Sequence, residues 1–350
     1  ILPKNMWPGG IFVNWYIQMS GGKISKSKGG AQPIPGAAEK FSVDGMRLYY
    51  AHIASPFVDV EWNDSTVMNY RARNERIYST VTRLFTQGPT QGGMDRWLIS
   101  RLHTHLQKVE EAMEQFLIRD YANTVFFDMM TDLRWFERRG GGERSALMEY
   151  ICSWVKLMSP VTPHLAEELW EYMGNEELVT LSRFTNFQSS LVDSFVEREE
   201  EHLRNVMSDT EDIIRMRQIQ PEEIHYYICS KWKREVMQIA ADIVIAGGNQ
   251  GDVMKTVMTD PAFRQKGKIL TNYIGSLIKE MKTLNESGLQ IMATPLDEEH
   301  VLKSAAQFLS SEFNCPVKVW NEDEDIEDPM NKARASKPMR PAIWVKERDI

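Results

Sequence analysis

The sequence has few cysteines and no long apolar runs. Its three cysteines, Cys152, Cys229 and Cys315, are widely separated. This spacing excludes a disulfide framework and any Cys-x-x-Cys metal site, so we expect a cytoplasmic protein without a bound metal. No apolar stretch approaches the roughly 18 residues that a membrane-spanning helix requires. The first 40 residues lack the pattern of a signal peptide, because Pro and Gly interrupt their one apolar stretch and no small-residue cleavage site follows.

Positive charge is scarce overall but unevenly distributed. The chain has 41 basic and 49 acidic residues, a net charge of −8, which alone argues against a nucleic-acid-binding protein. Residues 1–38, however, contain four lysines and no acid, and a run of acids at residues 322–328 precedes a basic tail. The basic side chains of interest are Arg71, Arg73, Arg76, Arg134, Arg138, Arg139, Lys332, Arg334, Lys337 and Arg340. These side chains either form ordinary solvated surface or make local surfaces that bind phosphate. The net charge does not exclude the second alternative, because local patches and not the total charge decide phosphate contact.

The pattern of apolar residues divides the chain into segments, and its 350 residues are enough for two or three domains. Residues 11–18 are rich in strand-forming residues and predict a strand, whereas the Lys, Ser, Gly and Pro of residues 23–35 predict a loop. Helical spacing then recurs from residue 62 to residue 217 and predicts a helical bundle. After residue 219, short strands at 224–229, 317–320 and 342–345 interleave with helices, which predicts a small α/β or α+β domain.

One loop carries the residue types that phosphate chemistry needs. The string Lys-Ile-Ser-Lys-Ser occupies residues 23–27 between two glycine pairs. Glycines let a backbone approach a ligand, hydroxyls and amides bond phosphate oxygens, and lysines supply positive charge where a pyrophosphate leaves. The spacing of a Walker loop is not present. On composition alone, the alternative is a flexible surface loop.

This string resembles the Lys-Met-Ser-Lys-Ser loop of class I aminoacyl-tRNA synthetases, with Ile24 in place of Met. The neighbouring Asp-Gly-Met-Arg-Leu-Tyr-Tyr at residues 44–50 is similar to the Asp-x-x-Arg-Leu-Tyr element that follows this loop in the leucine enzymes. One departure is Gly30, where the family usually has Asn. The resemblance implies that Lys26 stabilises charge on the departing pyrophosphate, while Lys23, Ser25 and Ser27 help to position it.

Three further segments extend the resemblance over essentially the whole chain. Residues 159–170 look like the Pro-His-x-x-Glu-Glu-x-Trp helix of the class Ia tRNA-binding bundle. On the residues alone, this segment is a helix with Thr162 as its N-cap and Pro163 at its first position. Asp-Leu-Arg-Trp at residues 132–135 is similar to a segment of archaeal and eukaryotic leucyl enzymes. We expect Trp135 to pack inward, while the neighbouring arginines either contact tRNA phosphates or are solvated. The basic tail resembles the C-terminal domain of the same group.

The resemblance implies a mostly α, multidomain architecture. We expect the tail of a Rossmann-type catalytic core at residues 1–60, a helical anticodon-binding-type bundle at 61–218, and a C-terminal α/β (α+β) domain at 219–350. Because no His-x-Gly-His element occurs and the chain begins at Ile1, we expect the C-terminal part of a leucine–tRNA ligase that is inactive alone. The implied partners are ATP with Mg²⁺, leucine and tRNA(Leu), with no membrane and a monomeric state. The alternatives are a non-catalytic tRNA-binding module, a fragment of an isoleucyl, valyl or methionyl relative, or a purely structural helical scaffold.

Overall fold

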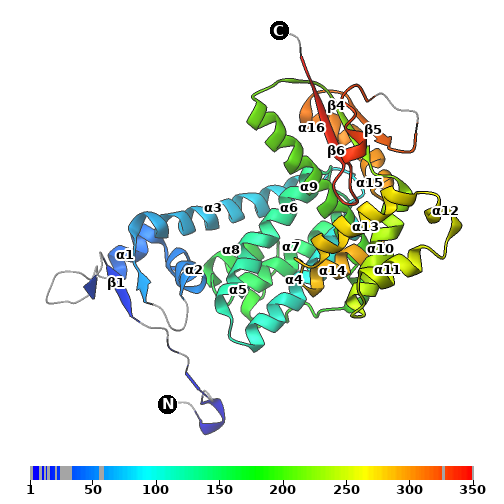
Figure 1. The fold of residues 1–350 in the computed structure, drawn as a ribbon. Coiled ribbons are helices and arrows are strands. Elements are labelled where there is room, and N and C mark those ends of the chain that lie inside the picture. Colours follow the sequence, from blue (N-terminus) through cyan, green and yellow to red (C-terminus); the bar gives the residue numbers. More distant parts are fainter. Residues whose placement is uncertain are drawn as a thin grey trace. The chain divides into compact units, whose positions relative to one another are not determined.

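The computed structural model describes residues 3–7, 10–11, 13, 16–19, 22–23, 34–54, 59–324 and 328–348. Figure 1 shows a mostly helical chain with two small sheets. The chain forms two compact units, Ile1–Ser194 and Phe195–Ile350. The predicted boundary at residue 218 follows the end of a long helix whose residues from 195 onward belong to the second unit. The three-part division of the chain therefore stays a prediction. Within the described ranges, no helix is both long and apolar enough to span a membrane.

The first unit begins with a small sheet in the order β2-β1-β3. Strand β1 (Ile17–Met19) pairs antiparallel with β2 (Gly22–Lys23) and parallel with β3 (Val60–Glu61). The predicted strand over residues 11–18 was wrong in its extent, because β1 begins only at Ile17. Among the described residues before it, the side chains at positions 11, 13 and 16 are largely exposed, so strand propensity there has no packing partner to stabilise it.

Helices make up the rest of the first unit, as the helical spacing predicted from residue 62 onward. Their bounds are α1 (Ile34–Phe41), α2 (Val43–Ile53), α3 (Asp64–Gln87), α4 (Asp95–Glu114), α5 (Ile118–Asn123), the π-helical turn η3 (Thr124–Asp128), α6 (Met129–Arg138), α7 (Arg144–Met158) and α8 (Pro163–Tyr172). The helical spacing is interrupted between residues 116 and 136, since Phe116 has a positive φ and η3 separates α5 from α6.

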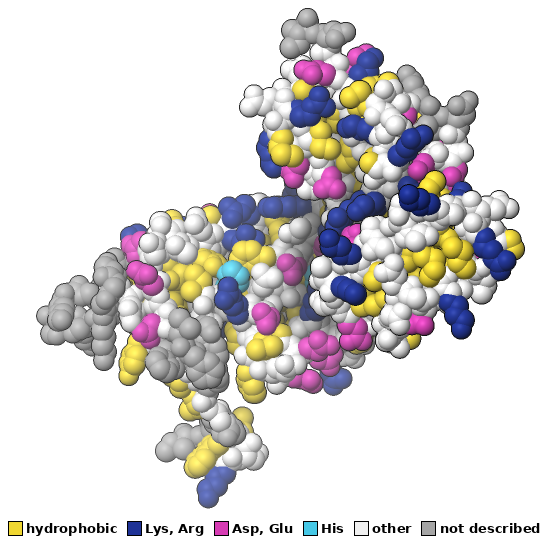
Figure 2. All heavy atoms as spheres, in the orientation of Figure 1, with side chains coloured by type: hydrophobic (Ala, Val, Ile, Leu, Met, Phe, Trp, Pro, Cys, Tyr) yellow, Lys and Arg dark blue, Asp and Glu magenta, His cyan; other side chains and the backbone are white. Residues whose placement is uncertain are grey.

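The bundle core of this unit is built from one apolar stripe of each helix. Trp97, Phe126, Leu133 and Trp154 are among its buried side chains, with exposures of 2% or less. Burial of such stripes supplies most of the stability of packed helices, at about 25 cal/mol per Å² of apolar surface. The opposite faces stay outside, and Figure 2 shows Lys and Arg side chains gathered along the edge where α3 and α6 lie in Figure 1.

The second unit combines a three-stranded sheet with helices. Its elements are α9 (Ser194–Arg217), β4 (Pro221–Ile228), α10 (Lys231–Ile245), α11 (Gln250–Val257), α12 (Pro261–Arg264), α13 (Gly267–Met281), α14 (Glu286–Ala293), α15 (Glu298–Ser304), α16 (Ala306–Phe313), β5 (Val317–Asn321) and β6 (Ala342–Glu347). The central strand β4 pairs parallel with β5 and antiparallel with β6. This arrangement confirms the mixed α and β character predicted after residue 219.

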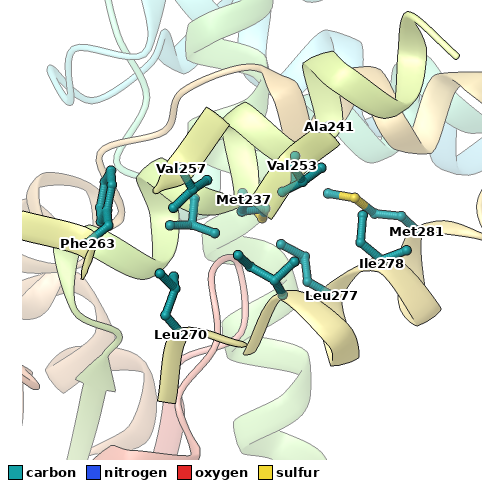
Figure 3. Packing of buried hydrophobic residues seen from close by; sticks show 12 residues of the cluster. Met237, Ala241, Val253, Val257, Phe263, Leu270, Leu277, Ile278 and Met281 are labelled. Atoms are coloured by element: carbon teal, nitrogen blue, oxygen red, sulfur yellow. The ribbon is translucent and has the colours of Figure 1, made fainter. Parts of the chain in front are cut away.

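Apolar side chains from α10 to α13 form a separate core in this unit. Figure 3 shows Met237, Val253, Leu270 and Ile278 pointing toward one another from α10, α11 and α13. Phe263 of the short helix α12 belongs to the same cluster. This helix begins as its sequence predicts, with Asp260 as N-cap accepting from the Ala262 N–H at 2.8 Å and Pro261 at the first position.

Candidate nucleic-acid interface

The predicted ATP loop lies mostly outside the described residues. Ser25, Lys26 and Ser27 are among the residues that the structure does not describe. Lys23 is described only as the last residue of β2, the outer strand of the first sheet. The roles of this loop remain those that the resemblance implies.

The two segments at residues 44–50 and 159–170, which resemble family motifs, contact each other directly. Asp44 of α2 accepts the Leu165 N–H at 2.7 Å and lies 2.9 Å from the His164 Nδ1. Arg47, one turn later, donates to the carbonyl oxygens of Pro160 and Val161 at 2.8 Å each. Asp44 is buried, whereas most of the His164 side chain is exposed. These contacts fasten the segment that follows the loop to the first turn of α8.

This geometry refines the prediction for α8. Thr162 is its N-cap residue and Pro163 opens the helix, as predicted, but the Thr162 side chain makes no capping hydrogen bond. The carboxylate of Asp44 satisfies a helix N–H instead, and a negative charge is favourable at a helix N-terminus. The sequence could not show this, because the capping residue lies 121 positions from the amide it binds.

Asp132 has a comparable structural role inside the bundle. It is 2% exposed and accepts from Arg101 Nε at 2.7 Å, while His105 Nε2 lies 2.8 Å from the same carboxylate oxygen. Burial by itself would raise the pKa of Asp132, but the His105 hydrogen bond and the Arg101 charge outweigh it and hold that pKa at about 2. Trp135 is 6% exposed, which confirms that it packs inward.

The glycine triplet at residues 140–142 ends α6 and packs against the loop before α4. Gly140 and Gly141 have positive φ values of 94° and 74°, which glycine adopts without strain. A Cβ on Gly92 would lie 2.3 Å from the Gly140 carbonyl, so the two backbone segments approach too closely for a side chain. The Asp95 carboxylate accepts the Glu143 N–H at the start of α7. The triplet therefore serves a close turn between helices.

Three of the predicted arginines come together on the α3–α6 face. Arg73 lies over the Phe127 ring, 3.7 Å from its centre, and donates to the Phe126 carbonyl at 3.1 Å. Burial, followed by the charges of Arg76 and Arg134, lowers the pKa of Arg73. A guanidinium is destabilised by like charges at close range, so this cluster favours an anion beside it.

A cavity of about 360 Å³ lies beside this cluster, and we call it the phosphate pocket. It is lined by Ala72, Glu75, Arg76, Ser79, Thr80, Met130 and Arg134. Arg76 and Arg134 are exposed, and neither forms an ion pair or hydrogen bond within the described part of the chain. Guanidinium groups with neighbouring hydroxyls are the usual contacts of a phosphate. This combination of free cations and hydroxyls makes the pocket a candidate backbone-phosphate site.

The other predicted arginines of the bundle already have contacts within the chain. Arg71 pairs with Glu75 at 3.0 Å and donates to the carbonyl oxygens of Glu39 and Lys40, where α1 ends. Arg138 lies 5.9 Å from the centre of the Trp135 ring. Arg139 ends α6 and donates its backbone N–H to the Trp135 carbonyl at 2.9 Å. These contacts make the three arginines less available to a ligand than Arg76 and Arg134.

Sequence reasoning missed one cation on this face, Arg119 of α5. Burial and then the charge of Arg119 lower the pKa of His52, whose ring stacks on Phe127 at 4.4 Å between centres. Arg119 therefore lies on the Phe127 side of the arginine cluster. A single basic residue in a short helix leaves no signal in the sequence, because its place near His52 depends on the packing of α5 against α2.

In the second unit the four predicted tail residues fall into two kinds. Lys332 is half-buried and donates to the Ile343 carbonyl at 3.0 Å, and Lys337 lies 3.7 Å from Glu280. Arg334 and Arg340 are exposed, and the described residues give neither side chain a partner. No group of three His, Cys, Asp or Glu side chains that could hold a metal occurs in the described ranges.

Comparisons with known proteins give matches to tRNA ligases. Residues 4–86 match the family described as tRNA synthetases class I (M), and residues 95–226 match the anticodon-binding domain of tRNA ligase. A leucine–tRNA ligase of Methanosarcina mazei is 30% identical over 358 residues, and one of Methanocaldococcus jannaschii is 33% identical over 353 residues. These matches cover 99% of this chain but 37% and 35% of the two relatives. The chain thus spans little more than a third of the length of these relatives.

Proposed function

From the homology of nearly the whole chain to one part of archaeal leucine–tRNA ligases, we propose that it is the C-terminal part of such an enzyme. The enzyme would activate leucine with ATP and Mg²⁺ and transfer it to tRNA(Leu) in the cytoplasm. In this proposal the chain supplies the ATP loop and RNA-binding helices and is inactive alone. The homology favours leucine over isoleucine, valine or methionine.

The loop at residues 23–27 would act on the pyrophosphate as the family resemblance implies. Lys26 would stabilise negative charge as the pyrophosphate leaves, and Lys23, Ser25 and Ser27 would bind and orient the phosphates. The Asp44–Arg47 contacts with α8 support this role, because they fix the segment after the loop to the bundle. A change in how RNA binds the bundle would then also change the position of the segment that follows the loop.

The observation that carries the RNA-binding part is the phosphate pocket with its unpaired Arg76 and Arg134. We propose that tRNA(Leu) lays its backbone along the α3–α6 face, with the arginines at 71, 73, 138 and 139 contributing to the positive field. Arg334 and Arg340, with Lys332 and Lys337 beside them, would form a second contact with RNA. The acidic total charge does not oppose this, since screening limits each charge to about 10 Å at 0.1 M salt.

The test is the salt dependence of tRNA(Leu) binding by this 350-residue chain. Replacing both Arg76 and Arg134 with Ala should weaken binding and reduce the slope of log K against log salt by about 1.5, because each phosphate contact contributes about 0.7–0.9. Arg183→Ala is the matched control: Arg183 is exposed and unpaired in the described part of the first unit but lies in a different loop. Equal slopes for the double variant and the control would contradict the proposed interface.

A further inference from the structure

A second cavity in the first unit lies between α2, α3 and α8. Its volume is about 690 Å³, and we call it the nucleoside cleft. It is lined by Ala38, Ser42, Val43, Asp44, Arg71, Asn74, Glu75, Tyr78, Ser79, His164, Leu165 and Glu168. A single nucleoside fits within a cavity of the size that small-molecule sites usually have. The cleft is distinct from the phosphate pocket but shares Glu75 and Ser79 with it.

Asn74 in this cleft has unused hydrogen-bonding capacity. The residue is 7% exposed, and neither its amide nitrogen nor its amide oxygen has a hydrogen-bond partner among the residues that the structure describes. A buried polar group without a partner destabilises a fold, so such groups are rare in the absence of a functional reason. Both atoms are shielded from water although the residue lines the cleft, so the side chain must change its rotamer for the amide to contact a ligand there.

The other walls match the two parts of a nucleoside. Tyr78 offers an aromatic face on which an unstacked base can lie, and an Asn amide presents the donor and acceptor that a base edge requires. Ser42 and Glu168 provide a hydroxyl and a carboxylate that can bond ribose hydroxyls. His164, oriented by Asp44, lines the same cleft. Three carboxylates, of Asp44, Glu75 and Glu168, and one arginine that is already paired make the cleft unsuited to a phosphate.

From this geometry we infer that the nucleoside cleft receives one unpaired nucleoside of the bound RNA, with its base on the Asn74 amide. The inference rests on the proposed function and deepens it. The shared residues Glu75 and Ser79 place the cleft next to the phosphate pocket, so that a nucleoside in the cleft can have its phosphate on Arg76 and Arg134. Recognition of a splayed-out base beside a backbone contact is a common mode of single-stranded RNA binding.

The decisive variant is Asn74→Leu, which removes the unsatisfied amide while keeping a similar volume. It should raise the Tm of the chain by about 2–4 °C, because a buried group without partners is replaced by an apolar one. It should also weaken binding of a tRNA(Leu) transcript about tenfold, with the slope against salt unchanged since no charge is lost. Tyr78→Leu should weaken binding without the gain in Tm. Asn186→Leu, an exposed asparagine of the same unit, is the matched control.

Chemical probing of the transcript gives a second measurement. In the wild-type complex the base edge of one unpaired nucleotide should be protected from modification, and the Asn74→Leu complex should leave it reactive. The inference would be overturned if Asn74→Leu and Tyr78→Leu both bind the transcript within twofold of wild type, or if Asn74→Leu still protects the nucleotide. Either outcome would leave the proposed phosphate pocket unaffected. A wild-type chain that binds no tRNA would refute the proposed function itself. An equal loss with Asn186→Leu would show a non-specific effect and would also overturn the inference.

Discussion

Asp132→Asn tests whether the Asp-Leu-Arg-Trp string stabilises the bundle or contacts RNA directly. Asp132 is buried between Arg101 of α4 and His105 one turn later. The substitution keeps the shape of the side chain but removes the negative charge, which leaves the Arg101 guanidinium without its ion-pair partner. Removing one partner of a buried ion pair destabilises proteins strongly, by about 3–5 kcal/mol where the charge is fully buried.

The pKa of Asp132 gives a separate magnitude. It is about 2 in the folded chain against an ordinary value of 3.8, so the folded state binds the proton less tightly than the unfolded state. The carboxylate therefore contributes stability above about pH 4, and this contribution is lost as the pH falls toward 2. The difference between 3.8 and 2 corresponds to about 2.4 kcal/mol of unfolding free energy.

Urea denaturation measured against pH is the assay. At pH 7, Asp132→Asn should lower the free energy of unfolding by about 2–3 kcal/mol, and this deficit should stay constant down to about pH 4 and narrow as the pH falls from 4 toward 2. Asp128→Asn, one turn earlier and half-exposed, is the control and should change little. A stability unchanged by Asp132→Asn, together with weaker tRNA binding, would refute the structural role.

Two further predictions concern a buried carboxyl and the loop lysine. Burial raises the pKa of Glu298 to about 7, despite the nearby charges of Arg198 and Arg234, so the folded state holds its proton more tightly than the unfolded state. Its contribution to stability is present below about pH 4.5 and is lost as the pH rises through 7. The free energy of unfolding of Glu298→Gln should therefore rise by about 2.5 kcal/mol relative to that of wild type between pH 5 and pH 8, as measured by urea titration. A difference in unfolding free energy that does not change with pH would contradict the burial argument. Lys26→Ala in the full-length gene product should slow leucine-dependent ATP–pyrophosphate exchange at least a hundredfold, while tRNA(Leu) affinity stays within about twofold. Equal losses in both assays would rule out the proposed role at the pyrophosphate.

Local signals predicted most helices but not how they contact each other. The apolar spacing of residues 67–84 and the Asp-Pro opening at residue 260 each depend on neighbours within a few positions, and α3 and α12 form accordingly. The segment at residues 23–35 was predicted as a loop, whereas α1 begins at Ile34 within it, and residues 298–313 form two short helices, α15 and α16. These short helices depend on packing from distant segments, which periodicity cannot show.

The candidate site divides in the same way. The basic composition of α3 and α6 allowed either a solvated surface or a phosphate surface, and the sequence could not tell Arg76 and Arg134, which are available, from Arg71, which is held by Glu75 and two carbonyl oxygens. The Asn74 amide gave no signal either, because an asparagine in a helix is ordinary until its partners are known. Motif resemblance pointed to similar tRNA ligases, and three-dimensional contacts then separated structural residues from those open to a ligand.

The central claim is that the α3–α6 face holds the backbone of tRNA(Leu), and a hydroxyl-radical footprint of the transcript on the chain tests it most directly. We expect one continuous protected stretch with the wild-type chain and the Arg183→Ala control. The same stretch should be exposed with the Arg76→Ala, Arg134→Ala double variant. Protection that is identical in all three complexes would contradict the claim.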